Sequence, residues 1–122
     1  MSAVNGLYVH AAILLMDGAA DPAAPGAAIT TALCGHWEHS PPCPLAPHHT
    51  GWSRNGDMVS LRIIFATKPA SEGDVRGLID GALAPGAFDT PRNTISRWTL
   101  LASGPAELTD QEREHAERIA GT

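Results

Sequence analysis

Charged side chains are scarce in this chain, and positive ones are scarcer than negative ones. They make up 17% of the 122 residues, and the formal net charge is −5. Lys68 is the only lysine, and the seven arginines are scattered along the sequence. Proteins that bind a nucleic-acid backbone need clustered positive charge. The sequence therefore predicts no nucleic-acid partner.

Long hydrophobic runs are absent too. The apolar run Leu7–Met16 spans ten residues, about half of the roughly 20 that a membrane-crossing helix needs. It lacks the basic stretch and the cleavage site that are typical of a secretory signal. We therefore expect no membrane partner and a cytoplasmic location, where cysteines stay reduced.

The length suits one domain over residues 1–122, large enough to bury a core without disulfides. Hydrophobic residues make up 43% of the chain, but many of them are alanine. The core must therefore come from a few dense apolar segments. The sequence contains no internal repeat and no heptad pattern that would predict a repeat array or a coiled coil.

Hydrophobic periodicity and turn residues divide the chain into four strands and three helices. The turn Asn55-Gly56-Asp57 between two strand-like runs is typical of a β-hairpin. Ser71 and Thr109 begin capping-box sequences, which mark the starts of helices. In chain order the predicted elements are strand Leu7–Met16, helix Gly26–Leu33, strands His48–Arg54 and Met58–Thr67, a helix ending at Leu83, strand Asn93–Ser103 and helix 109–120.

This order, β-α-β-β-α-β followed by a terminal helix, predicts an α+β protein with a ferredoxin-like split βαβ sheet. In that arrangement the first and third strands are central, the second and fourth lie at the edges, and two helices cover one face. The composition agrees with it, because Leu7–Met16 and Met58–Thr67 are the most apolar strands and His48–Arg54 is polar.

Side chains alternate across a strand, so each strand gives one set to the helices and the other to the opposite, open face. We expect Val59, Leu61, Ile63 and Phe65 to pack under the helices. The residues expected on the open face are Tyr8, His10, Leu14, Met16, Arg62, Ile64, Arg97 and Leu101. An apolar patch of this kind is typical of an interface. We therefore expect a homodimer packed sheet to sheet.

The segment from Cys34 to His49 holds both cysteines and four of the six histidines. Its four prolines are incompatible with a helix or a central strand, so an irregular, rigid loop is expected. Two thiolates with two imidazoles suit a tetrahedral zinc or copper site, and the candidate ligands are Cys34, His36, His39 and Cys43. The alternative is a loop whose histidines bond to the backbone and whose cysteines pack as small hydrophobic residues.

Two functions follow from this segment. In the first, which we favour because both cysteines lie among these histidines, the domain presents the loop to bind a transition metal. In the second, the protein is a cofactor-free acid/base enzyme of the isomerase or cyclase type, acting on a small acidic metabolite between the loop and the open face of a dimer. Its expected proton-transfer residues are His48, His49, Glu38 and His10. Its expected substrate-binding residues are Arg62, Arg97 and Tyr8.

Overall fold

The computed structural model describes residues 6–18, 20–34, 48–89 and 95–114, and they form an α+β fold. A helical turn at residues 110–114 follows the last strand. Among the described helices, none is long and apolar enough to cross a membrane. In chain order the elements are β1 (Gly6–Met16), α1 (Ala24–Cys34), β2 (His48–Asn55), β3 (Met58–Thr67), a short 3₁₀ helix η1 (Pro69–Ser71), α2 (Glu72–Leu83), β4 (Ala87–Asp89) and β5 (Ile95–Ala106).

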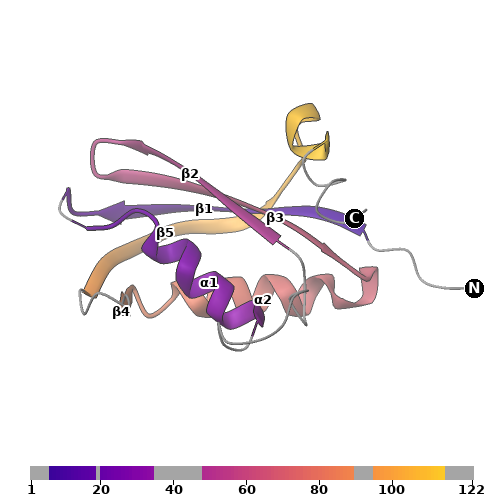
Figure 1. The fold of residues 1–122 in the computed structure, drawn as a ribbon, viewed down its shortest axis with the longest axis horizontal. Helices are drawn as coiled ribbons and strands as arrows, with labels where there is room; N and C mark the ends of the chain where they lie inside the picture. The colour runs from indigo at the N-terminus through magenta and orange to yellow at the C-terminus, as the bar shows by residue number, and fades with distance from the viewer. Residues whose placement is uncertain (1–5, 19, 35–47, 90–94, 115–122) are drawn as a thin grey trace, which may run out of the picture.

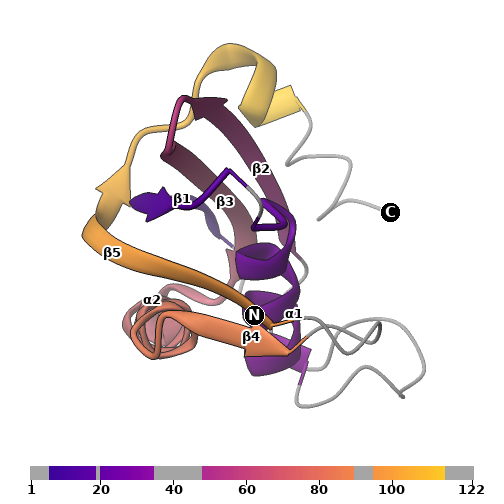
Figure 2. The same ribbon diagram turned by 90° about the vertical axis from the view of Figure 1, so that its left-hand side faces the viewer.

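The strands form one antiparallel sheet in the order β2-β3-β1-β5-β4. The sheet is curled into a half-barrel rather than flat (Figure 2). Helices α1 and α2 lie on one face, and the helical turn 110–114 lies on the other (Figure 1). We call these the helix face and the open face. The sheet thus has five strands where the sequence predicted four.

The fifth strand, β4, lies between Leu83 and Asn93, where the sequence predicted no helix or strand. Gly86 has a φ of 70°, and a side chain there would meet the carbonyl oxygen of Trp98 at 2.6 Å. Only glycine suits that turn. The turn leads Ala87–Asp89 alongside β5, so the last long strand is interior rather than at the edge.

The hairpin between β2 and β3 was predicted correctly. Asn55 pairs with Met58, and Gly56 between them has a φ of 64°. A positive φ is the conformation that Asn-Gly turns favour. The side chain of Arg54 supports the turn, since its Nε donates a hydrogen bond to the carbonyl oxygen of Gly56 over 2.8 Å.

The core lies between the sheet and the two long helices. The alternation predicted for β3 is confirmed, because every second side chain from Val59 to Phe65 is buried in that core. Trp98 of β5 joins it, and its indole Nε1 donates to the carbonyl oxygen of Leu83 over 2.9 Å. The helix residues buried against the sheet are Ala24, Ala28, Ile29 and Leu33 of α1 and Val75, Ile79 and Leu83 of α2.

The prediction for β1 was wrong by one residue. Leu14 and Met16, expected on the open face, are buried in the core under the helices, whereas Leu15 is 44% exposed on the open face. Directly opposite residues share a face, and Leu14 pairs with Val59. The reason is that β1 is apolar at nearly every position, so it has no alternation from which to read the register.

Only one of the two predicted capping boxes forms. Ser71 is the N-cap of α2 but makes no side-chain capping bond. At the last helical turn both bonds are present: the Thr109 N–H donates to Glu112 Oε1 over 2.9 Å, and the Glu112 N–H donates to Thr109 Oγ1 over 3.1 Å. These two reciprocal hydrogen bonds fix Thr109 as the residue at which the helical turn starts.

Candidate functional site

A groove of about 390 Å³ lies on the open face, between the hairpin and the last helical turn. Strand β2 forms one wall, β3 the floor and the turn 110–114 the other wall. We call it the open-face groove. It is lined by His49, Gly51, Trp52, Ser53, Ser60, Arg62, Ile64, Gln111 and Glu112.

An ion pair closes one side of the groove. The Nε of Arg62 donates to Glu112 Oε2 over 2.6 Å, and its Nη2 donates to Glu112 Oε1 over 2.7 Å. The same Nη2 donates to the carbonyl oxygen of Glu107 over 2.7 Å. Two parallel bonds between a guanidinium and a carboxylate are the strong, geometrically specific form of this interaction. Arg62 lies on the open face, as the alternation of β3 predicted.

The ion pair shifts the pKa values of both Arg62 and Glu112. The hydrogen bond from Arg62 is the main reason that the pKa of Glu112 falls from its ordinary value of 4.5 to about 2, with help from the Thr109 N–H and against the effect of burial. The hydrogen bond to Glu112 raises the pKa of Arg62 in return. Glu112 is therefore a carboxylate throughout the neutral and mildly acidic range.

We expect this ion pair to make stability depend on acid pH. The folded-state pKa of Glu112 is lowered, so the ionised carboxylate stabilises the folded protein. This contribution to the free energy of unfolding is complete above about pH 4.5 and disappears as the pH falls toward about 2. The difference in melting temperature between wild type and Glu112→Gln should therefore shrink below about pH 4.5. Thermal melts followed by circular dichroism at a series of pH values measure it. A difference that stays constant to pH 2.5 would contradict the assignment.

The chain that carries Glu112 is held to the sheet by a small apolar cluster. Val9 and Ile64 are buried on the open face, and Leu108 packs against them. The sequence predicted a helix at 109–120 but did not predict this contact with the sheet. The capping box at Thr109 and the apolar Leu108 just before it were the signals that could have shown it.

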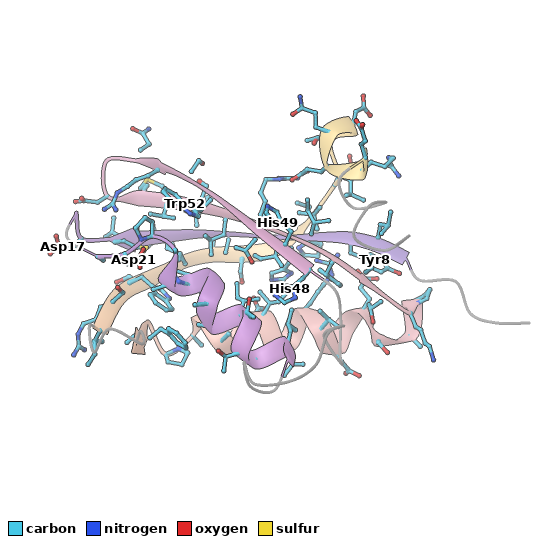
Figure 3. The ribbon with its side chains drawn as sticks, in the orientation of Figure 1. Tyr8, Asp17, Asp21, His48, His49 and Trp52 are labelled. Carbon is cyan, nitrogen blue, oxygen red and sulfur yellow. The ribbon has the colours of Figure 1, made fainter. Side chains whose placement is uncertain are left out.

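The adjacent histidines His48 and His49 lie on opposite faces of the edge strand β2 (Figure 3). The ring Nε2 of His48 is 3.0 Å from Thr30 Oγ1 of α1, on the helix face. His49 lines the open-face groove. This follows from the two-residue period of a strand. Of this pair, only His49 can act on a molecule in the groove.

His10 lies on the helix face, not on the open face where it was predicted. It is 2% exposed, and its Nε2 is 2.8 Å from Asp80 Oδ1. Its Nδ1 is 3.0 Å from Arg76 Nη1. Since a guanidinium can only donate, Nδ1 is the acceptor, and Nε2 carries the hydrogen that Asp80 accepts. Both ring nitrogens are thus engaged in holding α2 to β1.

Tyr8 is displaced from its predicted position for the same reason. It packs on the helix side, with its ring 5.4 Å from that of Phe65. The guanidinium of Arg76 lies 5.8 Å from the centre of the Tyr8 ring. Tyr8 and His10 therefore belong to one network with α2, on the far side of the sheet from the groove.

Arg97 is exposed on β5, as predicted, but far along the sheet from Arg62. The β1 partner of Arg62, Ala11, pairs with Gly104 of β5. Arg97 lies seven residues from Gly104, which is roughly 20 Å along a strand. The two arginines cannot hold one small carboxylate together.

Most of the predicted metal site lies outside the described residues. This applies to His36, His39 and Cys43, and also to the predicted catalytic residue Glu38. Cys34 is described as the last residue of α1. Within the described ranges, no group of three or more histidine, cysteine or acidic side chains is placed to hold a metal ion.

Of the predicted site residues, the structure brings His49 and Arg62 to one groove. The sequence reasoning assigned no site role to the groove residues Trp52, Ser53, Ser60 and Glu112. No family model matches the chain, and neither a curated protein nor a solved structure matches it. The function must therefore be inferred from the geometry of the groove.

Proposed function

We propose that this protein binds a small molecule in the open-face groove and that His49 exchanges a proton with it. The observation that carries the proposal is the groove itself, about 390 Å³ in volume with an imidazole in its lining. That volume suits a small metabolite. An imidazole titrates near neutral pH, so it can take up and return a proton during a reaction.

The pairing of β2 with β3 supports the proposal because it lines up the polar groups. On the open face Ser53 is directly opposite Ser60, and Gly51 is directly opposite Arg62. Gly51 has no side chain, so the space over this part of the hairpin stays empty between His49 and Ser53. Two hydroxyls can orient a ligand there, and the apolar side chain of Ile64 lines the same groove.

The reaction that these groups support is a proton transfer of the isomerase or cyclase type. One imidazole can remove a proton from one atom of the ligand and return it to another. The hydroxyls of Ser53 and Ser60 can donate to an oxygen that gains charge in between. Such a reaction needs no redox cofactor.

The neighbouring histidines provide a matched test. We expect His49→Ala to slow deuterium exchange from solvent into a groove-bound carbon acid at least about 100-fold, the usual scale of general acid–base catalysis. His48→Ala removes the same ring from the helix face and should leave the exchange within about threefold of wild type. Proton NMR of a panel of small carbon acids in D₂O measures both. Equal effects of the two changes, or no exchange with wild type, would refute the proposed role of His49.

Metal binding by the segment Cys34–His49 is a second candidate function, favoured by one contact. The hydrogen bond between Thr30 and His48 joins the last turns of α1 to the first residue of β2, so the two ends of this segment are held together. Cys34, His36, His39 and Cys43 would bind zinc or copper, with an affinity that falls as the histidines protonate. Elemental analysis of wild type and of a Cys34→Ser, Cys43→Ser double variant tests this. Metal-free wild type, or an unchanged double variant, would exclude the proposed site.

Two features of the fold also remain proposals. The succession β-α-β-β-α-β, with β1 and β3 adjacent and antiparallel, supports a ferredoxin-like arrangement to which β4 is added. A homodimer through the open face is supported by large apolar side chains there that are at least one-third exposed: Ile13, Leu15, Met58 and Leu101. A native mass of one chain at tens of micromolar would contradict the dimer.

A further inference from the structure

We infer that the ligand of the open-face groove carries a carboxylate, and that Glu112 occupies the place of this carboxylate on Arg62 until the ligand displaces it. The inference rests on the proposed function of the groove. It adds the chemical class of the ligand and a regulatory role for the last helical turn.

The first argument is the way in which Arg62 is presented. Its Nε and Nη2 each bond one oxygen of the same carboxylate, over 2.6 and 2.7 Å. Its side chain is 40% exposed, whereas that of Glu112 is only 16% exposed. The guanidinium is thus a ready fork for a carboxylate, and it can be reached from the groove as well as from the turn.

The second argument is that Arg62 stays oriented when Glu112 leaves. The Nη2 of Arg62 also donates to the carbonyl oxygen of Glu107 over 2.7 Å. The acceptor is a backbone carbonyl in the residue that directly follows β5, so this bond does not depend on the Glu112 side chain. The fork therefore does not have to be rebuilt for an incoming ligand.

The third argument is that Glu112 also bonds Thr109, and this interaction can persist when Glu112 leaves Arg62. Its Oε1 accepts a hydrogen bond from the Thr109 N–H, and its own N–H donates to Thr109 Oγ1. A Glu112 side chain that leaves Arg62 can keep this capping box, so the helical turn need not unfold. Partly exposed ion pairs contribute little net stability, so a ligand that also contacts Ile64 and the two serines can compete.

Glu112 and the ligand compete for Arg62, and Glu112 belongs to the same chain. This determines whether a variant should bind the ligand more or less tightly. A tethered carboxylate acts at an effective concentration in the millimolar range or above. It therefore weakens the binding of every ligand that needs Arg62, but not the binding of a ligand of the same shape that lacks the charge. Removal of the Glu112 charge should strengthen carboxylate binding selectively.

The experiment uses benzoate and its uncharged analogue benzamide as probes. Both are titrated into the full chain, and NMR follows the backbone N–H signals of Gly51 and Ser53 and the Nε–H of Arg62. In Glu112→Gln, which keeps the capping box because glutamine also serves at that position, we expect benzoate to bind at least about fivefold more tightly than to wild type. Benzamide should change by less than about twofold.

Three variants complete the design. Glu112→Asp keeps the charge but shortens the side chain, and it should also tighten benzoate binding by withdrawing the carboxylate from the fork. Glu114→Gln makes the same charge change at an exposed residue of the same turn, and benzoate should bind it as it binds wild type. Gly51→Val fills the groove and should abolish the binding of both probes.

The outcomes separate the two proposals. If both probes bind in a manner that Gly51→Val abolishes, but neither Glu112 variant favours benzoate, the competition by Glu112 is refuted while the groove remains a binding site. If neither probe shifts the Gly51 and Ser53 signals in any variant, the groove proposal fails and the carboxylate inference fails with it. Tighter benzoate binding in Glu114→Gln as well would attribute the effect to net charge and refute the specific role of Glu112.

Discussion

Leu14→Ala should lower the free energy of unfolding by about 2–5 kcal/mol, whereas Leu15→Ala, one residue along the same strand, should lower it by less than about 1 kcal/mol. Leu14 is fully buried among the helix-face residues, and Leu15 is 44% exposed on the open face. The change removes the same atoms in both cases. The difference between the two therefore measures which face of β1 packs under the helices.

Urea denaturation of the two variants provides the measurement. It should be made at a chain concentration at which the protein is monomeric, so that association does not add to the stability. A larger loss for Leu15→Ala would mean that β1 presents the face that the sequence alone suggested, and two equal losses would contradict the burial of Leu14 alone. A larger loss for Leu14→Ala would show that Leu14, and not Leu15, packs under the helices in solution.

Arg76→Ala should lower the free energy of unfolding by about 2–3 kcal/mol, because it removes one donor from several acceptors at once. Its Nη1 donates to the carbonyl oxygen of Val9 over 2.8 Å and to His10 Nδ1. Its Nε donates to Glu72 over 2.8 Å, and its guanidinium lies 5.3 Å from the centre of the Phe65 ring. Without Arg76, the buried His10 keeps a ring nitrogen that has lost its donor.

The control is Arg113→Ala, which removes an exposed arginine from the helical turn 110–114. It should change the stability by no more than about 0.5 kcal/mol, as is usual for exposed positions. Arg76→Lys should fall between the two, because lysine keeps the charge near the aromatic rings but lacks the planar fork. If Arg76→Ala and Arg113→Ala cost the same, the network around His10 does not hold α2 to the sheet.

The sequence allowed only some of the groove residues to be predicted. His49 and Arg62 were selected as candidates because their chemistry is recognisable from residue type alone. Glu112 was not, because its role depends on a partner 50 residues away in the chain. The pairing of Ser53 with Ser60 depends on the register of the hairpin, and neither serine carries a local signal for a site.

His10 illustrates the opposite error. A histidine in an apolar strand was grouped with the catalytic candidates because of the face it was thought to share with Arg62. The structure engages both of its ring nitrogens, one with Arg76 and one with Asp80. Both partners lie in α2, so nothing near His10 in sequence could have indicated them.

The sequence by itself determined the features that depend on neighbouring residues. It determined the α+β class, the Asn55-Gly56 turn, the buried side of β3 and the capping box at Thr109, because turn chemistry and alternation are local. Only the tertiary structure decided the face of β1, the added strand β4 and the ion pair between Arg62 and Glu112. A strand that is apolar on both sides has no preferred register until its neighbours pack against it, and an ion pair between distant residues exists only once the chain has folded.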